Sequence, residues 1–233
     1  SKTNQEVVDF MMEFGDKLLG KTTVLCKDTP AFIANRVGVF AIQELFHIVD
    51  ELNLTVTEID SLTGPIMGRP KSATFRTCDV VGLDTLIHVA NGLKENCPND
   101  ERSTVFNLPL FIAKMKENNW LGSKTGQGFY KKTINESGKK EILELDLKTF
   151  EYKSTSKTKF ETIGKARGID NLKKRTKVLF NGNDKAGDFY RRMFAGLLSY
   201  ASHRIPEISD EIYRLDEAMK LSLIHISEPT RPY

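Results

Sequence analysis

The sequence predicts a mainly α-helical fold that carries one β-hairpin. Apolar residues recur at helical spacing in several stretches, most clearly over residues 33–52, whereas apolar and charged residues alternate only over residues 143–152. Apolar residues are 39% and charged residues 28% of the 233 residues, and the mean hydropathy is −0.35, as expected of a folded, soluble chain. The longest apolar run, residues 37–42, is far shorter than the roughly 18 residues of a membrane-spanning helix, so we expect no membrane span.

The first 26 residues predict one helix and one strand. Thr3 and Glu6 have the spacing of a capping box, and apolar residues follow at helical spacing as far as Leu18, with Gly20 as a stop. Residues 22–26 are a short β-branched run between lysines, which predicts a buried strand. A lone strand needs partners, and we expect them in a segment upstream of this chain, whose natural start we expect to be lost.

The strongest predicted helix follows. Thr29 suits the N-cap and Pro30 the first helical position, and an apolar stripe then continues to Leu52. The opposite face is also apolar or small, a pattern that predicts a helix covered on nearly all sides. Asn35 falls on that second apolar face.

Shorter helices and two loops come next. Thr55 and Glu58 form a second capping box that begins a helix through Leu62, and a glycine- and proline-rich loop follows over residues 64–70. Residues 79–94 and 108–118 read as two further helices. Three glycines in the segment LGSKTGQGFY, residues 121–130, then require a shaped loop.

The rest of the chain predicts a hairpin, a connector and a second helical unit. Residues 143–152 alternate about a turn at Lys148 and Thr149, and a basic connector follows to about Asp184. Helical stripes resume at residue 185 and again after Pro206, and laying Asp216 on Asp60 suggests a repeat in which Arg191 replaces Asn35. We therefore divide the chain into segments 1–26, 27–133, 134–184, 185–220 and 221–233.

The last of these segments breaks the helical pattern. LSLIHISEPTRPY, residues 221–233, resembles translated read-through of a transposon-type sequencing adapter. We expect it to be non-native and give His225 no functional weight.

Charge and cysteine content limit the classes of function. The formal net charge is +3, but residues 131–185 hold 15 basic and 8 acidic residues, which predicts a solvated connector or a surface for phosphate-bearing partners. Aromatic residues do not interleave there, so nucleic-acid binding is not expected. The three cysteines are far apart and lack partner histidines, which predicts neither a disulfide framework nor a metal site and fits a reducing, cytoplasmic environment.

Two side chains are candidates for chemistry. Asn35 must find hydrogen bonds if its apolar face is buried, so it either satisfies neighbouring backbone groups or points into a cleft toward a substrate oxygen or a catalytic partner. Lys124 is either a solvated loop lysine or, through the close backbone approach that Gly126 and Gly128 permit, a contact for a phosphate or ribose. Arg36 is expected to be structural and paired with an acid such as Asp28.

The four histidines carry less weight as candidates. His47 and His88 lie within helical stripes and are expected to have core or boundary roles, while His203 is expected at the surface.

Three segments carry a resemblance to a known family. KDTPAFIANR (residues 27–36), residues 67–84 and LGSKTGQGFY (residues 121–130) together resemble the C-terminal domain of 3-hydroxyacyl-CoA dehydrogenases. The later segments look like the long bacterial form, in which an enoyl-CoA hydratase domain comes next. Residues 1–26 then look like the last helix and strand of the NAD-binding Rossmann domain.

The resemblance implies roles for both candidates. Asn35 would hydrogen-bond the C3 oxygen region of a 3-hydroxyacyl-CoA substrate beside the catalytic histidine, and Lys124 would contact NAD from this domain. The family's catalytic histidine–glutamate pair and NAD-binding glycine loop belong to the upstream domain, so we expect this chain alone to be inactive. An alternative from another class is a helical dimerisation or docking module, with a homodimer as one outcome.

Overall fold

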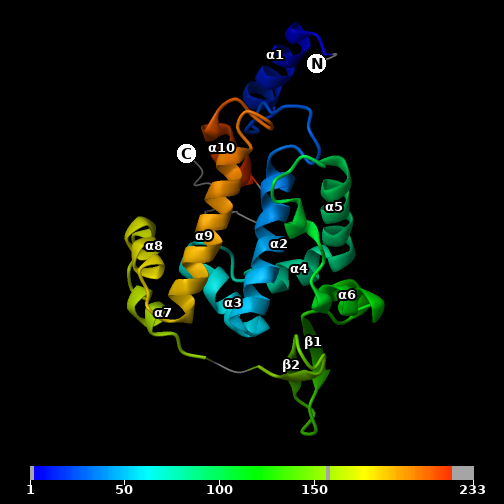
Figure 1. Ribbon diagram of the computed structural model, residues 1–233, viewed down its shortest axis with the longest axis vertical. Helices are drawn as coiled ribbons and strands as arrows, with labels where there is room; N and C mark the ends of the chain where they lie inside the picture. The colour runs from blue at the N-terminus through cyan, green and yellow to red at the C-terminus, as the bar shows by residue number, and fades with distance from the viewer. Residues whose placement is uncertain (1–2, 156–157, 222–233) are drawn as a thin grey trace.

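The centre of the molecule is formed by two long antiparallel helices, α2 (Ala34–Leu52) and α9 (Lys185–His203), which lie side by side (Figure 1). The computed structural model describes residues 3–155 and 158–221. Phe40 of α2 stacks on Tyr200 of α9 with ring centroids 3.7 Å apart, so aromatic packing joins two helices that are far apart in the sequence.

The other elements surround this pair. In chain order the helices are α1 (Gln5–Glu13), α3 (Val56–Thr63), α4 (Phe75–Val81), α5 (Leu83–Asn96), α6 (Leu110–Glu117), α7 (Glu161–Ala166), α8 (Leu172–Phe180) and α10 (Ile212–Leu221). Short helical turns are η1 (Phe14–Leu18), η2 (Pro65–Met67), η3 (Ser103–Phe106) and η4 (Ser123–Thr125). The strands β1 (Tyr130–Ile134), β2 (Lys140–Leu145) and β3 (Tyr152–Ser154) form one antiparallel sheet in that order. The prediction of a mainly helical fold is confirmed.

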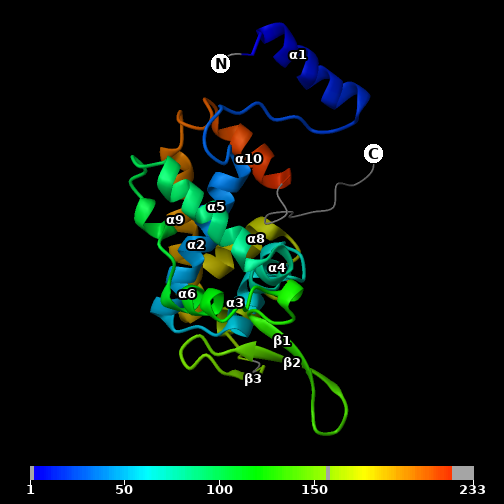
Figure 2. The same ribbon diagram turned by 90° about the vertical axis from the view of Figure 1, so that its right-hand side faces the viewer.

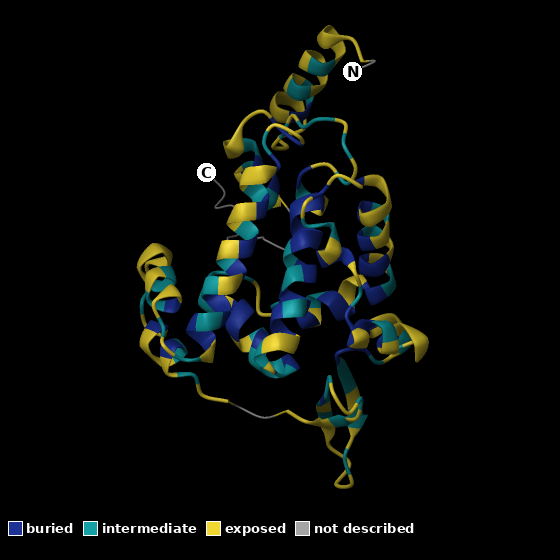
Figure 3. Ribbon diagram, viewed as in Figure 1, coloured by how far each residue is buried: buried dark blue, intermediate teal, exposed yellow. Residues whose placement is uncertain are grey.

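Aromatic side chains fill the lower part of the core. Phe46, Phe75, Phe111 and Phe129 are all buried, and the rings of Phe75 and Phe129 are 4.2 Å apart. Burial is greatest along α2 and on the inner faces of α4, α5 and α9 (Figure 3). The cluster joins α2 to the segment that follows the glycine-rich loop, so packing of that loop depends on the main helix.

The N-terminal segment differs from its prediction. The helix α1 begins after Asn4, whose side chain accepts a hydrogen bond from the Glu6 amide, so Asn4 and not Thr3 is the N-cap. Residues 22–26 form no strand, because no strand among the described residues lies beside them to complete the ladder. Figure 2 shows α1 set apart from the helical body, and none of its residues is buried.

Two helix boundaries also differ. The long helix begins at Ala34, not after Thr29, because Ala31 and Phe32 adopt left-handed backbone angles (φ 64° and 51°) that interrupt the helical path. The single helix predicted over residues 79–94 is two helices, α4 and α5, separated by Gly82 at φ 98°. The capping box of Thr55 and Glu58 is confirmed.

The basic connector contains regular structure that the sequence pattern did not predict. The predicted hairpin corresponds to β2 and β3, but a third strand, β1, pairs with the other edge of β2. Helices α7 and α8 occupy much of the connector, and α9 and α10 confirm the two predicted helices beyond it. The proposed repeat and segment boundaries remain predictions, and residues 222–233, which hold most of the adapter-like tail, lie outside the described residues.

Candidate functional site

Asn35 lies in the first turn of α2, and its side chain is exposed. The sequence pattern placed it on an apolar face that would be covered. In the structure Asn35 is exposed, although its neighbours Arg36 and Val37 in the same turn are buried. The amide is therefore free to meet a partner from outside the bundle and does not serve as a buried backbone cap.

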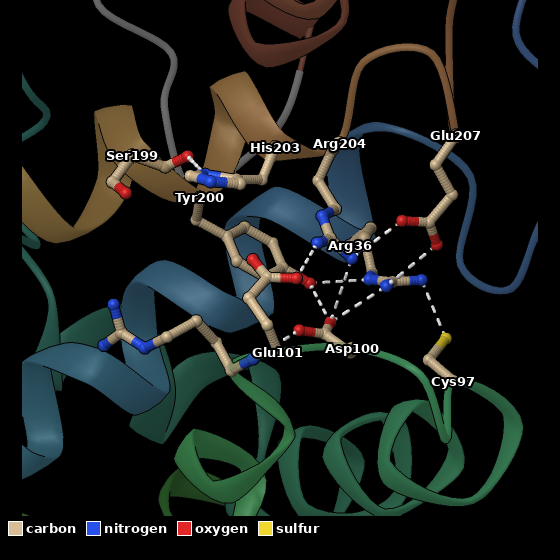
Figure 4. Close-up of polar contacts among 10 residues, drawn as sticks. Arg36, Cys97, Asp100, Glu101, Ser199, Tyr200, His203, Arg204 and Glu207 are labelled. Atoms are coloured by element: carbon tan, nitrogen blue, oxygen red, sulfur yellow. Dashed lines mark hydrogen bonds and ion pairs between the residues drawn. The ribbon is translucent and has the colours of Figure 1, made fainter.

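The next residue, Arg36, points the other way and is fully buried. Its guanidinium donates hydrogen bonds to the Tyr200 hydroxyl (2.6 Å), the Cys97 sulfur (2.7 Å) and an Asp100 carboxylate oxygen (2.9 Å). A carboxylate oxygen of Glu207 is 3.1 Å from the same guanidinium. Figure 4 shows the planar group enclosed by these four partners. The expected structural role is confirmed, but the acids are Asp100 and Glu207 and not Asp28, whose side chain is exposed.

A second arginine closes this network. Arg204 follows the last turn of α9 and makes ion pairs with Glu207 (2.7 Å), Asp100 (3.4 Å) and Glu101. The Tyr200 hydroxyl also donates to Asp100 over 2.7 Å. Together these contacts lower the pKa of Asp100 although burial raises it, so the carboxylate stays charged between two arginines. Sequence reasoning missed these partners because they are separated from Arg36 by 61 to 171 residues, and local periodicity carries no signal for such pairing.

Lys124 lies in η4 of the glycine-rich loop, and its side chain is about half exposed (47%). The ammonium forms an ion pair with Asp84 in the first turn of α5, and this hydrogen bond lowers the pKa of the Asp84 carboxyl. The structure therefore gives the lysine an internal partner that the sequence did not predict. Lys124 and Asn35 sit on different elements, η4 and α2, each open to solvent.

The glycine-rich loop is held by one carboxylate. Asp79, at the end of α4, accepts hydrogen bonds from the backbone amides of Phe129 (2.8 Å) and Tyr130 (2.9 Å). A Cβ atom at Gly122 or Gly128 would overlap Asp79, so both positions require glycine. The prediction of a shaped loop is confirmed, and its shape comes from this close approach.

Asp60 joins the same region from α3. It accepts backbone hydrogen bonds from Phe75 (2.7 Å) and its neighbours at the start of α4, and one from the Tyr130 hydroxyl (2.8 Å). Burial raises the pKa of Asp60 to about 6 and that of Asp79 to about 6, while the amide donors act in the opposite direction. Both oxygens of each carboxylate accept hydrogen bonds from the protein, so we assign the two residues to loop and helix anchoring.

The three histidines among the described residues do not form a site. His47 lies 3.1 Å from the Val105 carbonyl oxygen and fills a boundary position on α2, as expected. His203 is at the surface beside the Ser199 carbonyl oxygen (2.8 Å), as expected. His88 is exposed, so its predicted core or boundary role is wrong. Within residues 3–155 and 158–221, no group of three or more His, Cys, Asp or Glu side chains is arranged to hold a metal ion. Across the same residues, no helix combines the length and the apolar content that crossing a bilayer demands.

Known proteins resemble this chain over most of its length. Residues 32–132 match the family described as 3-hydroxyacyl-CoA dehydrogenase, C-terminal domain. A probable 3-hydroxyacyl-CoA dehydrogenase of Bacillus subtilis (strain 168) is 42% identical over 219 residues, which cover 94% of this chain and 27% of that protein. A putative fatty acid oxidation complex trifunctional enzyme of Rickettsia prowazekii is 28% identical over 217 residues, or 93% of this chain and 28% of that protein. The mitochondrial hydroxyacyl-coenzyme A dehydrogenase of Sus scrofa is 34% identical over 129 residues, 55% of this chain and 40% of its own length.

The two ends of the family match coincide with features of the structure. The family match begins at Phe32, beside the left-handed turn before α2, and ends in β1 just past the glycine-rich loop, so it includes both Asn35 and Lys124. The chain spans only 27% to 28% of the two longer relatives. Residues 32–132 are thus similar to the C-terminal domain of 3-hydroxyacyl-CoA dehydrogenases, and over 94% of its length the chain is similar to the probable 3-hydroxyacyl-CoA dehydrogenase of Bacillus subtilis.

Proposed function

We propose that this chain forms one wall of the active site of an NAD-dependent (S)-3-hydroxyacyl-CoA dehydrogenase. The observation that carries the proposal is the exposed Asn35 amide at the start of α2, next to a fully buried Arg36. An exposed amide on a firmly packed helix turn can hydrogen-bond a substrate oxygen without a change of backbone. The similarity of residues 32–132 to the family's C-terminal domain supports the same role.

In the proposed reaction, Asn35 holds the oxygen on C3 of the acyl chain. A histidine of an upstream domain removes the proton from the C3 hydroxyl, and the carbon releases hydride as the ketone forms. The Asn35 amide keeps the oxygen in register by donating to it as the carbonyl develops. The product is the 3-ketoacyl-CoA.

The residues of this chain fit only one edge of an NAD site. NAD supplies the hydride acceptor when it is bound. Lys124 is about half exposed and positively charged, and it can reach a phosphate or ribose from its loop while Asp84 limits its orientation. The sequence has no GxGxxG loop to cradle a dinucleotide. We therefore propose that the chain alone has no turnover and that an upstream domain provides the rest of the site.

A chimera tests this proposal. The 219-residue segment of the Bacillus subtilis relative that aligns with this chain is replaced by the chain, and NADH formation from 3-hydroxybutyryl-CoA is followed at 340 nm. We expect an active chimera in which Asn35→Ala lowers kcat about 100-fold. The control is Asn96→Ala, at the exposed end of α5, which should retain activity. An active chimera that is indifferent to Asn35→Ala would refute the role, and turnover by the unfused chain would refute its dependence on an upstream domain.

A docking role is the second candidate. Val80 and Leu110 are 73% and 70% exposed, so apolar side chains of α4 and α6 are available to a partner, including a second copy. Light scattering of the chain separates the two ideas, since a stable dimer supports docking and a monomer leaves only the cleft role. The proposed role of Asn35 at the wall of the active site is tested separately, by the Asn35→Ala variant of the chimera.

A further inference from the structure

The turn that presents Asn35 is held in an unfavourable backbone conformation. Ala31 and Phe32 both have positive φ angles, 64° and 51°, although neither is glycine. Ile33, the residue before α2, makes no side-chain capping hydrogen bond to the first turn. Left-handed residues with a Cβ cost free energy and persist only where the surroundings fix them. Within the turn the Phe32 amide donates to the Thr29 carbonyl oxygen (3.0 Å), and further contacts from elsewhere in the fold hold the chain around it.

Those contacts come from residues after α9. The Lys27 amide donates to the Ile208 carbonyl oxygen (3.1 Å), and its ammonium donates to the Pro206 carbonyl oxygen (2.6 Å). The same ammonium lies 2.5 Å from a carboxylate oxygen of Asp210. The chain entering the turn is thus tied by backbone and side chain to a segment about 180 residues later.

Apolar packing fixes the other side of the turn. Ile33 and Val37 are each 2% exposed and belong to one cluster with Ile208 and Leu215. Two of these side chains come from the start of α2 and two from the segment that leads into and includes α10. The first turn of α2 is therefore packed against the end of the second helical unit.

The buried hydrogen-bond network around Arg36 adds a third set of contacts next to Asn35. Arg36 is the neighbour of Asn35 in the same helical turn, and it donates from Nε to the Tyr200 hydroxyl over 2.6 Å. The Tyr200 hydroxyl in turn donates a hydrogen bond to Asp100. The Tyr200 ring stacks on Phe40, which lies one helical turn after Arg36 on α2. A rigid guanidinium held at both ends of its fork leaves the adjacent backbone little freedom.

We propose that the segment from Tyr200 to Leu215 is a positioning element for Asn35, and that Tyr200 is its main positioning residue, acting through Arg36. The inference rests on the proposed function of Asn35 but assigns a new part of the chain to the site. All of this segment lies outside residues 32–132, which match the family's C-terminal domain. The second helical unit, residues 185–220, thereby fixes the position of a candidate site residue in the first, residues 27–133.

The chain offers a matched control for Tyr200. Tyr190 lies ten residues earlier on the same helix, is equally buried (0% against 1% exposed), and its hydroxyl also donates one short hydrogen bond, to the Leu62 carbonyl oxygen at 2.7 Å. Changing either residue to phenylalanine removes a hydroxyl and keeps the ring. Only the Tyr200→Phe variant removes a contact to Arg36.

The first experiment uses the chain alone and does not depend on turnover. The backbone order parameter of Asn35 is measured by ¹⁵N relaxation in the unchanged chain and in both phenylalanine variants. We expect a value near 0.85 that falls below about 0.7 in Tyr200→Phe and is unchanged in Tyr190→Phe. An unchanged value in Tyr200→Phe, or an equal fall in both variants, would overturn the positioning role.

The second experiment uses the chimera with the Bacillus subtilis relative. At a temperature where both variants are folded, Tyr200→Phe should lower kcat about tenfold with little change in KM, and Tyr190→Phe should leave both unchanged. Equal losses in the two variants would show that Tyr200 acts only through stability. If Asn35→Ala has no effect on kcat, the proposed function fails, while the relaxation result still decides whether Tyr200 orders the turn.

Discussion

Replacing Arg36 by methionine should lower the free energy of unfolding by about 3 kcal/mol. The side chain is fully buried, and its removal leaves the buried Asp100 carboxylate without its nearest cation and the Tyr200 hydroxyl without a donor. Breaking a buried ion pair by removing one partner costs roughly 3 to 5 kcal/mol. Arg204 remains 3.4 Å from Asp100 and compensates in part, which places the expected loss at the lower end.

Urea denaturation followed by circular dichroism measures this loss. A change of about 3 kcal/mol in a chain of this size also lowers Tm by roughly 6 to 12 °C. The control is Arg192→Met, because Arg192 forms an exposed pair with Glu51 at 2.8 Å, and its loss should cost less than about 1 kcal/mol.

A double variant checks the cause. Arg36→Met combined with Asp100→Asn removes the unpaired buried charge along with its partner, so it should recover part of the stability that Arg36→Met loses. Equal losses for Arg36→Met and Arg192→Met, or a double variant that is simply additive, would refute the electrostatic reasoning.

Two further predictions concern the glycine-rich loop. Burial raises the pKa of Asp79, like that of Asp60, to about 6 in the folded chain, so the folded state binds the proton more tightly and the free energy of unfolding should fall as pH rises from about 4 to about 6. Asp79→Asn should flatten that fall by up to about 3 kcal/mol in urea titrations across this range, and an unchanged pH profile would contradict the assignment. Gly128→Ala should lower Tm by several degrees because its Cβ would overlap Asp79 and lie 2.6 Å from the Gly122 Cα. The control in the same thermal melts is Gly92→Ala, whose added Cβ would have no atom within 4 Å, so Tm should stay equal or rise. The steric argument would be disproved if Gly128→Ala and Gly92→Ala had the same Tm.

Helices with long apolar stripes or side-chain caps could be predicted from the sequence. The 19-residue helix α2 has enough apolar positions for its period to stand out, although its start was placed too early because Pro30 suits a helix but Ala31 and Phe32 interrupt it. The helix α3 was predicted because Thr55 and Glu58 cap it within four residues of sequence. Local signals of this kind need no knowledge of tertiary contacts.

Elements that depend on distant neighbours could not be predicted in this way. Helices α7 and α8 are 6 and 9 residues long and bury only Thr162, Ala166 and Leu179, so their patterns look like those of a charged connector. The run at residues 22–26 has strand-forming residues but no neighbouring strand in the described structure, and propensity alone does not make a sheet.

The candidate site shows the same division. Asn35 and Lys124 could be identified from their local sequence context, and both residues are exposed. The partners of Arg36 were not found, because which side chains meet a buried guanidinium is decided by how α2, α5 and α9 pack and not by spacing in the sequence.

The face-to-face packing of Phe40 on Tyr200 bears on where this protein can be divided. A recombinant piece that stops at residue 132, where the family match ends, would strip one face of the Phe40 ring and remove the Tyr200 and Glu207 partners of Arg36. Such a piece should be prone to aggregate even though it carries every family motif. We therefore expect a stably folded piece of this protein to extend past residue 132 and to include Tyr200.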